Sequence, residues 1–377
     1  RRSAAAPVRS DRPEGFTQRE PLPDREGLRP TVRIDAGGGE RRLDPSAVDP
    51  LRRLAPVVRL APAQLNLTLA VSGRRADGYH SLHSVFVPLT LADRLSLAPV
   101  GVHHDTLHVT GLDAGPPADN LVFRAIAAAR GAVGGGHPGG PGPAPALAAR
   151  LEKRIPVAAG LAGGSSDAAA ALDGALEAWG AEIDEVTHHA VAARLGSDVP
   201  FFLAGGPALV EGRGETVAPL HGLHGAPGVL LVTPVIAVPT PDVFAAFDAI
   251  RHSGDGAVRM SSAHLAEELR AGLGAADLIA RAGVLASAND LLPATALVVP
   301  SLVPFKRALS RLLGRPIGLS GSGPTLWALY PSSEEAATAA DVVRAALGAG
   351  TITAPGAAEP FVAATAIVGH AREGEPS

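Results

Sequence analysis

The spacing of hydrophobic and polar residues predicts a mixture of strands and helices between residues 57 and 368. Short apolar runs bounded by Gly, Pro or Asp-Gly are typical of strands. Strands are expected over residues 57–60, 65–71, 82–89, 95–97, 107–109, 146–154, 229–238, 326–330 and 360–368. Apolar residues repeating every three or four positions predict helices over 121–131, 185–195, 242–250, 264–273, 302–313 and 334–347. Because the two kinds of element do not alternate regularly, the pattern indicates an α+β fold.

Smaller signals mark the connections between these elements. Pro62, between the strands expected over 57–60 and 65–71, predicts a bulge or an edge position, because proline cannot donate a backbone hydrogen bond. The Asp-Gly pair at residues 77–78 predicts a hairpin turn, and the Asp-Asn pair at 119–120 predicts a helix cap. The Gly/Pro-rich residues 131–145 predict an exposed loop, and residues 205–214 predict a series of turns.

A glycine-rich stretch carries the clearest chemical signal. Residues 156–171 read Pro-Val-Ala-Ala-Gly-Leu-Ala-Gly-Gly-Ser-Ser-Asp-Ala-Ala-Ala-Ala, and Leu172, Leu176 and Trp179 continue one apolar helix face. Glycine lets a backbone approach a ligand closely, and a helix starting just after the glycines exposes unpaired N–H groups at the positive end of its dipole. The stretch predicts an anion site, most naturally for phosphate. A plain turn with Ser165 as the helix N-cap fits the same residues, and the two interpretations are compatible.

Two familiar phosphate-binding motifs do not fit this stretch, and composition excludes further classes. A P-loop requires Gly-Lys-Ser/Thr, and the dinucleotide fingerprint requires a different glycine spacing. The net charge of −4 gives no basic surface for nucleic acid or an anionic membrane, and the longest apolar run, 228–238, is too short to span a bilayer. The absence of cysteine excludes disulfides and thiolate metal sites and fits a cytoplasmic protein.

The 377 residues are enough for two domains. Residues 1–55 are rich in Arg, Pro, Gly and acidic residues with little apolar periodicity, which predicts a disordered extension, with a misplaced start of the sequence as the alternative. We expect an N-terminal domain over 56–212, a C-terminal domain over 213–371 and a frayed tail over 372–377.

The glycine-rich stretch resembles the phosphate-binding loop of the GHMP small-molecule kinases, in the form found in the diphosphocytidyl-methylerythritol kinases. Four further segments resemble that family in the same order along the chain. They are Ala61-Pro-Ala-Gln-Leu-Asn-Leu, Arg74-Arg-Ala-Asp-Gly-Tyr-His, Gly196-Ser-Asp-Val-Pro-Phe-Phe and Gly318 to Thr325, with shorter echoes at Asn120-Leu121, 239–244 and Asn289-Asp-Leu. The resemblance covers residues 57–370.

This resemblance implies a two-domain GHMP kinase fold, with an N-terminal half like ribosomal protein S5 domain 2 and a ferredoxin-like C-terminal half. It implies ATP and Mg²⁺ as cofactors and transfer of the γ-phosphoryl group to the 2-hydroxyl of 4-diphosphocytidyl-methylerythritol, a step of isoprenoid synthesis. The ATP-binding residues would be Gly160, Leu161, Ala162, Gly163, Gly164, Ser165 and Ser166, with the two serine hydroxyls also available to Mg²⁺. The expected partner is a small molecule, and the expected state is a monomer or a weak homodimer.

Residues of the cleft between the two halves acquire roles from the same resemblance. Asp198 would be the catalytic base that accepts the hydroxyl proton, although a turn residue after Gly196 is the alternative. Tyr79 and Phe244 would stack on the cytosine ring, and His80 would hydrogen-bond its edge. Core packing explains Phe244 equally well, and a strand surface would explain the other two.

Several other positions have weaker assignments. Asn66 would orient the substrate or the base, unless it simply faces outward from a strand, and Thr240 would contact the substrate. Lys153 lies near the nucleotide in the family pattern, with a solvated strand end as the alternative. Asp167 is expected in the first helical turn, where the helix dipole favours an acid. The glycines within residues 321–323 would shape a turn facing the cleft.

The chain departs from the family pattern at Gln64, where the family's opening strand has a lysine. That lysine works with the catalytic aspartate, lowering its pKa and countering phosphate charge, whereas glutamine carries no charge. Arg59, five residues earlier on the strand, is expected to face the opposite side.

Three hypotheses follow for the function. The first is an active kinase whose rate is reduced by Gln64, which we retain as a catalytic-site position. The second is a non-catalytic homologue that binds a nucleotide or a cytidylate ligand. The third is a GHMP kinase of other specificity, such as homoserine or mevalonate kinase, which residues 77–80 disfavour. The intact Asp198 and the intact glycine-rich stretch favour the first.

Overall fold

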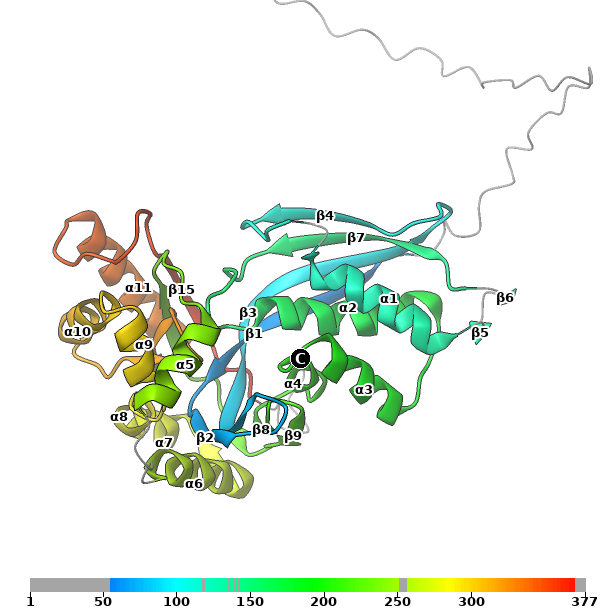
Figure 1. Cartoon of the computed structure of the whole chain (residues 1–377). Coiled ribbons are helices and arrows are strands. Elements are labelled where there is room, and N and C mark those ends of the chain that lie inside the picture. Colours follow the sequence, from blue (N-terminus) through cyan, green and yellow to red (C-terminus); the bar gives the residue numbers. More distant parts are fainter. Residues whose placement is uncertain are drawn as a thin grey trace, which may run out of the picture. The chain divides into compact units, whose positions relative to one another are not determined.

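The computed structural model describes residues 55–369 except 117–118, 135, 138–139, 142 and 251–255. The predicted extension 1–55, apart from its last residue, and the predicted tail 372–377 lie outside the described residues. Strands and helices follow one another in the mixed order that the sequence pattern predicts (Figure 1). None of the described helices is both long and apolar enough to cross a membrane.

A seven-stranded sheet organises the first part of the described chain. Its path runs β4-β7-β3-β8-β9, and β1 and β2 also pair with β3. The strands are β1 (Val57–Asn66), β2 (Ala70–Arg74), β3 (His80–Val100), β4 (Thr106–Gly111), β7 (Ala146–Lys153), β8 (Ala208–Gly212) and β9 (Thr216–Pro219). The strand β3 is 21 residues long and joins the segments 82–89 and 95–97 that the sequence predicts separately. Its length allows it to pair with four other strands.

The local predictions in this sheet are partly right. The register of β1 shifts between Pro62 and Gln64, so the bulge expected from Pro62 is confirmed. The single strand expected over 65–71 is wrong, because β1 ends at Asn66 and β2 begins at Ala70. The turns expected over 205–214 are also wrong in part, because β8 occupies residues 208–212 and pairs with β3.

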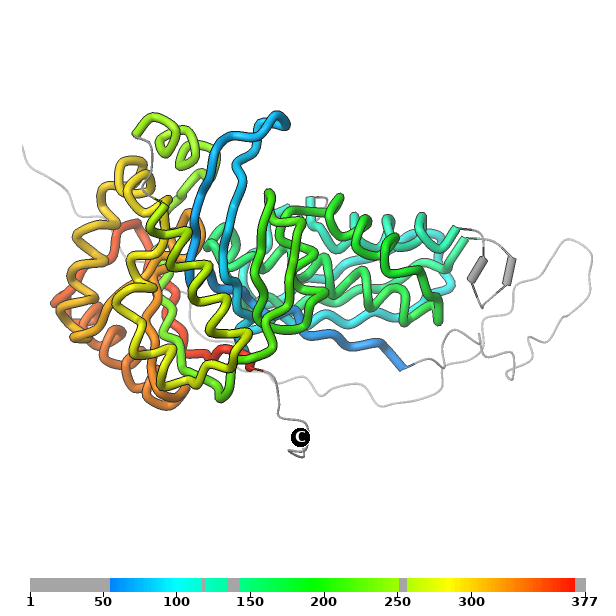
Figure 2. Tube along the Cα trace, turned by 90° about the horizontal axis from the view of Figure 1, so that it is seen from below, coloured from blue at the N-terminus to red at the C-terminus, as the bar shows by residue number. Residues whose placement is uncertain are grey.

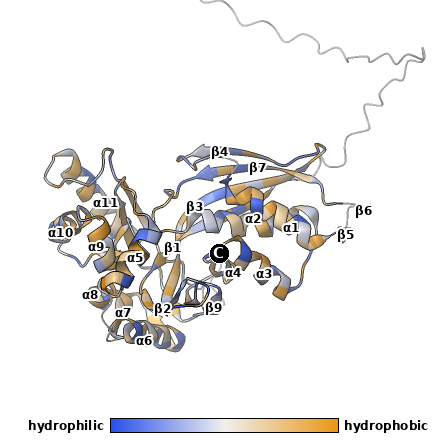
Figure 3. Ribbon diagram, in the orientation of Figure 1, coloured by the Kyte–Doolittle hydropathy of each residue, from blue (hydrophilic) through white to orange (hydrophobic). Residues whose placement is uncertain are grey.

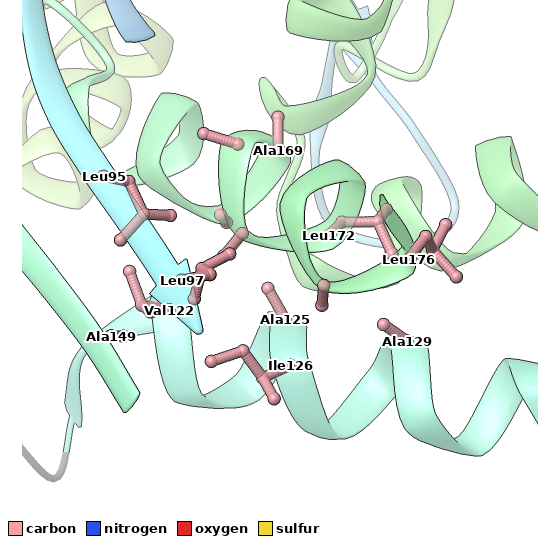
Figure 4. Close-up of a cluster of buried hydrophobic side chains, with 14 of the residues drawn as sticks. Leu95, Leu97, Val122, Ala125, Ile126, Ala129, Ala149, Ala169, Leu172 and Leu176 are labelled. Carbon is pink, nitrogen blue, oxygen red and sulfur yellow. The ribbon is translucent and has the colours of Figure 1, made fainter. Parts of the chain in front are cut away.

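Helices pack against this sheet through a continuous apolar core. They are α1 (Leu121–Val133), α2 (Gly163–Trp179), α3 (Glu185–Leu195) and α4 (Val199–Leu203). Figure 4 shows Leu95 and Leu97 of β3 facing Val122 and Ile126 of α1. The expected cap of α1 is confirmed, since the Asn120 side chain accepts a hydrogen bond from the Val122 N–H at 3.0 Å. In Figure 3, hydrophobic and hydrophilic colours alternate along the ribbons of α1 and α2.

The connection from α1 to β7 differs from the expected open loop. It carries two short strands, β5 (Gly136–His137) and β6 (Gly140–Pro141), which pair with each other.

A four-stranded sheet of order β13-β14-β11-β15 organises the second part. Its strands are β13 (Gly318–Leu319), β14 (Leu326–Tyr330), β11 (Gly228–Thr233) and β15 (Phe361–Ala366). The accompanying elements are α5 (Thr240–Ile250), α6 (Ala257–Ala271), α7 (Ala275–Ala280), α8 (Ala282–Leu285), α9 (Leu292–Val298), α10 (Leu302–Leu313), α11 (Ser333–Gly348) and the short pair β10 (Leu223–His224) and β12 (Leu273–Gly274). The strand predicted over 229–238 is therefore shorter than expected.

One apolar cluster is shared by the two sheets. Leu65 of β1 and Val87 of β3 belong to the same buried cluster as Leu231 of β11 and Trp327 of β14. The first sheet also continues past the boundary expected at residue 213, because β9 spans 216–219 and pairs with β8.

Candidate active site

The glycine-rich stretch forms a tight turn that leads directly into α2. The helix begins at Gly163, and its N-cap is Ala162 in the left-handed conformation, with φ of 50°. The helix start expected after the glycines and the Ser165 N-cap are therefore wrong, because Ser165 already lies inside the helix. The turn still presents the N-terminal N–H groups of a 17-residue helix, which is the anion-binding feature that the stretch predicts.

Glycine is required at position 160 for two reasons. Its φ of +75° lies in the left-handed region, and a Cβ atom there would lie 2.6 Å from the Ser320 carbonyl oxygen. The segment 318–325, which we call the second motif loop, packs against Gly160 and leaves no room for a side chain there. The Ser320 hydroxyl donates to the Gly160 carbonyl at 2.7 Å, and the Thr325 N–H donates to the Ala159 carbonyl at 3.2 Å.

The echo at Asn289 has a clear structural role. Its side-chain amide donates to the carbonyl oxygens of Leu319 and Gly321, at 3.0 and 2.9 Å. The neighbouring Asp290 accepts a hydrogen bond from the Val71 N–H of β2 at 2.9 Å. These contacts hold the second motif loop against the strands of the large sheet.

A cavity of about 610 Å³ opens where these segments meet. It brings together most of the residues that the sequence singles out as substrate or catalytic positions. Its lining includes Gln64, Asn66, Tyr79, His80, Gly160, Ala162, Asp198, Thr240, Phe244 and Gly321. The serines at 165 and 166, the glycines at 163 and 164, and Leu161 are not part of this lining.

Asp198 combines accessibility with a perturbed carboxyl group. It is half-buried at the cavity wall, immediately before α4, and its carboxylate has no hydrogen-bond partner among the described residues. Desolvation by the surrounding protein raises the pKa of Asp198 to about 6. A carboxylate with that pKa is ionised at neutral pH and basic enough to accept a proton.

Gln64 lies 3% exposed at the same cavity. Its backbone N–H donates to the Leu161 carbonyl at 3.0 Å, which ties the bulge of β1 to the glycine-rich turn. Its side-chain amide lies 3.4 Å from the Asn66 Oδ1 atom, whereas its Oε1 atom has no hydrogen-bond partner among the described residues. Arg59 does not supply the missing charge, because it pairs with Glu177 of α2.

Asn66 is buried and connects both sides of the site. Its amide donates to the Ser84 hydroxyl at 3.2 Å, and its carbonyl lies 3.4 Å from the Ser320 hydroxyl. The outward-facing alternative for Asn66 is therefore excluded.

One face of α5 forms the far end of the cavity. Thr240, Phe244 and Asp248 lie four residues apart and all contribute to the lining. The Phe244 ring stacks on the His80 ring at 4.9 Å between centroids, and His80 Nε2 lies 2.7 Å from an Asp248 carboxylate oxygen. In Figure 2 the hairpin of β2 and β3 runs beside α5, where His80 meets Phe244 and Asp248. Tyr79, at the hairpin tip, is 52% exposed.

The sequence interpretation missed Asp248, although its spacing from Thr240 and Phe244 was visible. The Thr240 hydroxyl also lies 3.0 Å from the hydroxyl of Ser322, which links α5 to the second motif loop.

Lys153 does not lie at a solvated strand end. It is 3% exposed, and its ammonium group donates to Asp93 and, at 2.7 Å, to Asp167. Asp93 also accepts a hydrogen bond from the Ile155 N–H at 2.9 Å. We call Asp93, Lys153 and Asp167 the buried triad. It joins β3, β7 and α2 beneath the glycine-rich turn.

Asp167 lies beyond the first turn of α2, so the dipole explanation for it is wrong. Burial is the largest influence on its carboxyl group and, together with Asp93, outweighs the attraction of Lys153, raising the pKa of Asp167 to about 7. Its Oδ1 atom and the Ser166 hydroxyl are buried without a hydrogen-bond partner among the described residues.

Comparison with known families identifies the class of protein that this fold and site define. Residues 120–206 match the family model of the GHMP kinases N terminal domain, and residues 265–349 match that of the GHMP kinases C terminal. The chain belongs to the GHMP kinase family, and it has the two-domain mixed α/β fold of that family.

Curated relatives of similar sequence point to one branch of the family. The 4-diphosphocytidyl-2-C-methyl-D-erythritol kinase of Pelotomaculum thermopropionicum is 38% identical over 282 residues, which cover 74% of this chain and 91% of the relative. The protein of the same name from Deinococcus radiodurans is 38% identical over 296 residues, covering 76% and 89%.

Solved structures give the same picture. The crystal structure of a 4-(cytidine 5'-diphospho)-2C-methyl-D-erythritol kinase is 32% identical, with a TM-score of 0.59, and covers 83% of this chain and all of that chain. The Methanococcus jannaschii mevalonate kinase has a TM-score of 0.60 at 10% identity, which shows that it shares the fold.

Proposed function

We propose that this protein catalyses the ATP-dependent phosphorylation of the 2-hydroxyl of 4-diphosphocytidyl-2-C-methyl-D-erythritol in isoprenoid biosynthesis. The observation that carries the proposal is Asp198, a carboxylate without a hydrogen-bond partner among the described residues, at a cavity that also contains Gly160 and the stacked His80–Phe244 pair. Relatives at 38% identity that are named 4-diphosphocytidyl-2-C-methyl-D-erythritol kinase support the same substrate.

In the proposed mechanism, the polyphosphate of ATP binds at the N-terminal end of α2. The residues assigned to it are Gly160, Leu161, Ala162, Gly163, Gly164, Ser165 and Ser166. Backbone N–H groups and the helix dipole stabilise the negative charge there. The buried, unpartnered Ser166 hydroxyl and the nearby Ser165 hydroxyl fit a phosphate oxygen or Mg²⁺, which would screen the phosphate charge when bound.

Asp198 then accepts the proton of the attacking hydroxyl. Phosphoryl transfer depends mainly on positioning and charge stabilisation, so the carboxylate must lie at hydrogen-bond distance from the bound hydroxyl. Gln64 and Asn66, which line the same cavity, are assigned to orient the acceptor sugar. The Oε1 atom of Gln64 is a free acceptor for a substrate hydroxyl.

The cytosine ring is assigned to the end of the cavity formed by α5 and the β2–β3 hairpin. Tyr79 and Phe244 offer aromatic faces for stacking, and His80 offers a polar edge held by Asp248. Thr240, on the same helix face, is assigned as a further substrate contact. We also propose residues 56–212 and 213–371 as the two functional domains. The first sheet continues across this boundary through β9, Thr216–Pro219.

The experiment that tests this function is ATP-dependent phosphorylation of the cytidylate substrate by purified protein, beside a Gln64→Lys variant. Activity in the native protein supports the proposal and shows that the lysine is dispensable here. Activity only in the variant supports the alternative of a non-catalytic homologue that still binds the ligand. No activity in either folded protein refutes the substrate assignment.

A further inference from the structure

Two arginines supply the positive charge of the cavity. Among the described residues that line it, Arg74 and Arg213 are the arginines, and the lining contains no lysine. Neither forms a salt bridge within the described part of the chain. By contrast, the cavity carboxylate Asp248 is already paired with His80. The guanidinium groups of Arg74 and Arg213 therefore have no carboxylate partner among the described residues and remain available to a bound anion.

Arg213 is held between the aromatic end of the cavity and the catalytic segment. Its backbone N–H donates to a Glu215 carboxylate oxygen at 2.6 Å, which fixes the turn between β8 and β9. The next residue, Gly214, packs so closely that a Cβ atom would lie 2.6 Å from the Ser197 carbonyl oxygen. On the other side, the Arg213 guanidinium carbon lies 5.5 Å from the centroid of the Tyr79 ring. Arg213 thus lies beside Tyr79, and its neighbour Gly214 packs against Ser197, which precedes Asp198.

Arg74 lies on the neighbouring turn, which is tied to the turn of Arg213. Its Nε atom donates to the Gly78 carbonyl at 3.2 Å across the β2–β3 turn. Arg75 contacts Asp77 at 3.1 Å and Glu215 at 3.7 Å, which connects the two turns. The nearby carboxylates of Asp77 and Glu215 therefore have other partners. Both cavity arginines lie on turns whose backbone is held by hydrogen bonds.

We propose that Arg213, assisted by Arg74, binds the diphosphate of the acceptor substrate. This inference rests on the proposed function, which places the cytosine at Tyr79 and the reacting hydroxyl at Asp198. A diphosphate joins those two parts of the substrate, and Arg213 lies between their assigned sites. The planar guanidinium group matches phosphate geometry through paired hydrogen bonds. This charge lies on the acceptor side of the cavity, where it partly offsets the uncharged Gln64.

The test is a binding titration with cytidine, cytidine diphosphate and a non-hydrolysable ATP analogue. Arg213→Gln should weaken cytidine diphosphate binding about 10- to 100-fold, because one charge-assisted contact is lost. Cytidine and the ATP analogue should bind within about twofold of the native protein, since neither places a diphosphate at Arg213. In turnover, KM for the acceptor should rise while KM for ATP stays unchanged. The matched control is Arg94→Gln, which removes the same charge from an exposed position of β3.

Other outcomes would overturn the proposal. Unchanged diphosphate affinity in Arg213→Gln would refute it, and weaker binding of the ATP analogue alone would assign the arginine to the other phosphate chain. If that variant does not fold, Arg213→Lys and the salt dependence of the native protein decide the question. The proposal requires that added salt weaken the binding of cytidine diphosphate much more than the binding of cytidine. It also requires that the Arg213→Lys variant retain part of the affinity for cytidine diphosphate.

The same data separate this inference from the proposed function. An active kinase with an unaffected Arg213→Gln variant would leave the function standing and remove the inference. A native protein that lacks kinase activity, but binds cytidine diphosphate more tightly than cytidine and loses this preference in Arg213→Gln, would refute the proposed function and leave the inference standing.

Discussion

Asp167 in the buried triad and Asp198 in the cavity are both aspartates whose pKa is raised mainly by burial. Asp167 is 2% exposed and bonded to Lys153, whereas Asp198 lines the cavity without a described hydrogen-bond partner. Both carboxyl groups are thus desolvated. They differ in whether they reach the cavity and in whether they have a hydrogen-bond partner. The triad fixes the strands beneath the glycine-rich turn, and the cavity leaves its carboxylate free to react.

The largest expected effect is on catalysis, from Asp198→Asn. An amide cannot accept the hydroxyl proton, so kcat should fall by about 10²- to 10⁴-fold. The melting temperature should stay the same or rise, because a desolvated carboxylate is removed. Steady-state kinetics with a parallel thermal melt check this, with Asp167→Asn as the matched control. An unchanged rate in Asp198→Asn would show that another group is the base.

The largest effect on stability is expected from Lys153→Met. Removing the ammonium leaves two buried carboxylates without their shared partner, which should lower the free energy of unfolding by about 3–5 kcal/mol. Urea unfolding measures it. Lys306→Met is the matched control, because burial lowers the pKa of Lys306 and no ion pair to it occurs among the described residues. A loss below about 1 kcal/mol in Lys153→Met would contradict the assigned role.

A smaller, pH-dependent effect is expected from Asp167→Asn. The pKa of Asp167 is about 7 in the folded protein and about 3.9 in an unfolded chain, so the folded state alone holds this proton between those values. Native stability should therefore fall as pH rises from about 4 to 7 through this group. The variant should lack that decline, so its stability relative to the native protein should rise by about 2–3 kcal/mol between pH 5 and pH 8. Equal pH dependence in both proteins would count against the raised pKa.

The smallest effect is expected from Gln64→Lys. A cation at the cavity favours the ionised form of Asp198 and should lower its pKa by about one unit. The acidic limb of the rate profile should move by the same amount, and the rate at pH 7.5 should rise a few-fold as phosphate charge is countered. Gln64→Met, which adds no charge, should leave the limb in place. A limb that moves equally in both variants would point to packing instead of charge.

The sequence was most informative where one residue type is physically required. Gly160 could be predicted because its conformation and its closeness to Ser320 both exclude a side chain. The strand β8 was missed because glycines surround it, and its pairing with β3 and β9, which the local sequence does not reveal, makes it a strand. Lys153 was misjudged for a similar reason, since its partner Asp93 lies 60 residues earlier in the chain. Asp248 and Arg213 acquire meaning only when folding places them beside His80 and Tyr79.

The most direct measurement is the pH dependence of kcat/KM for ATP-dependent phosphorylation of the cytidylate substrate, in the native protein and in Asp167→Asn. We expect kcat/KM to fall about tenfold per pH unit below pH 6 in both proteins, because protonation of Asp198 removes the base while the triad takes no part in the reaction. A flat profile, or a limb near pH 7 that disappears in Asp167→Asn, would contradict the assignment of Asp198 as the reacting carboxylate.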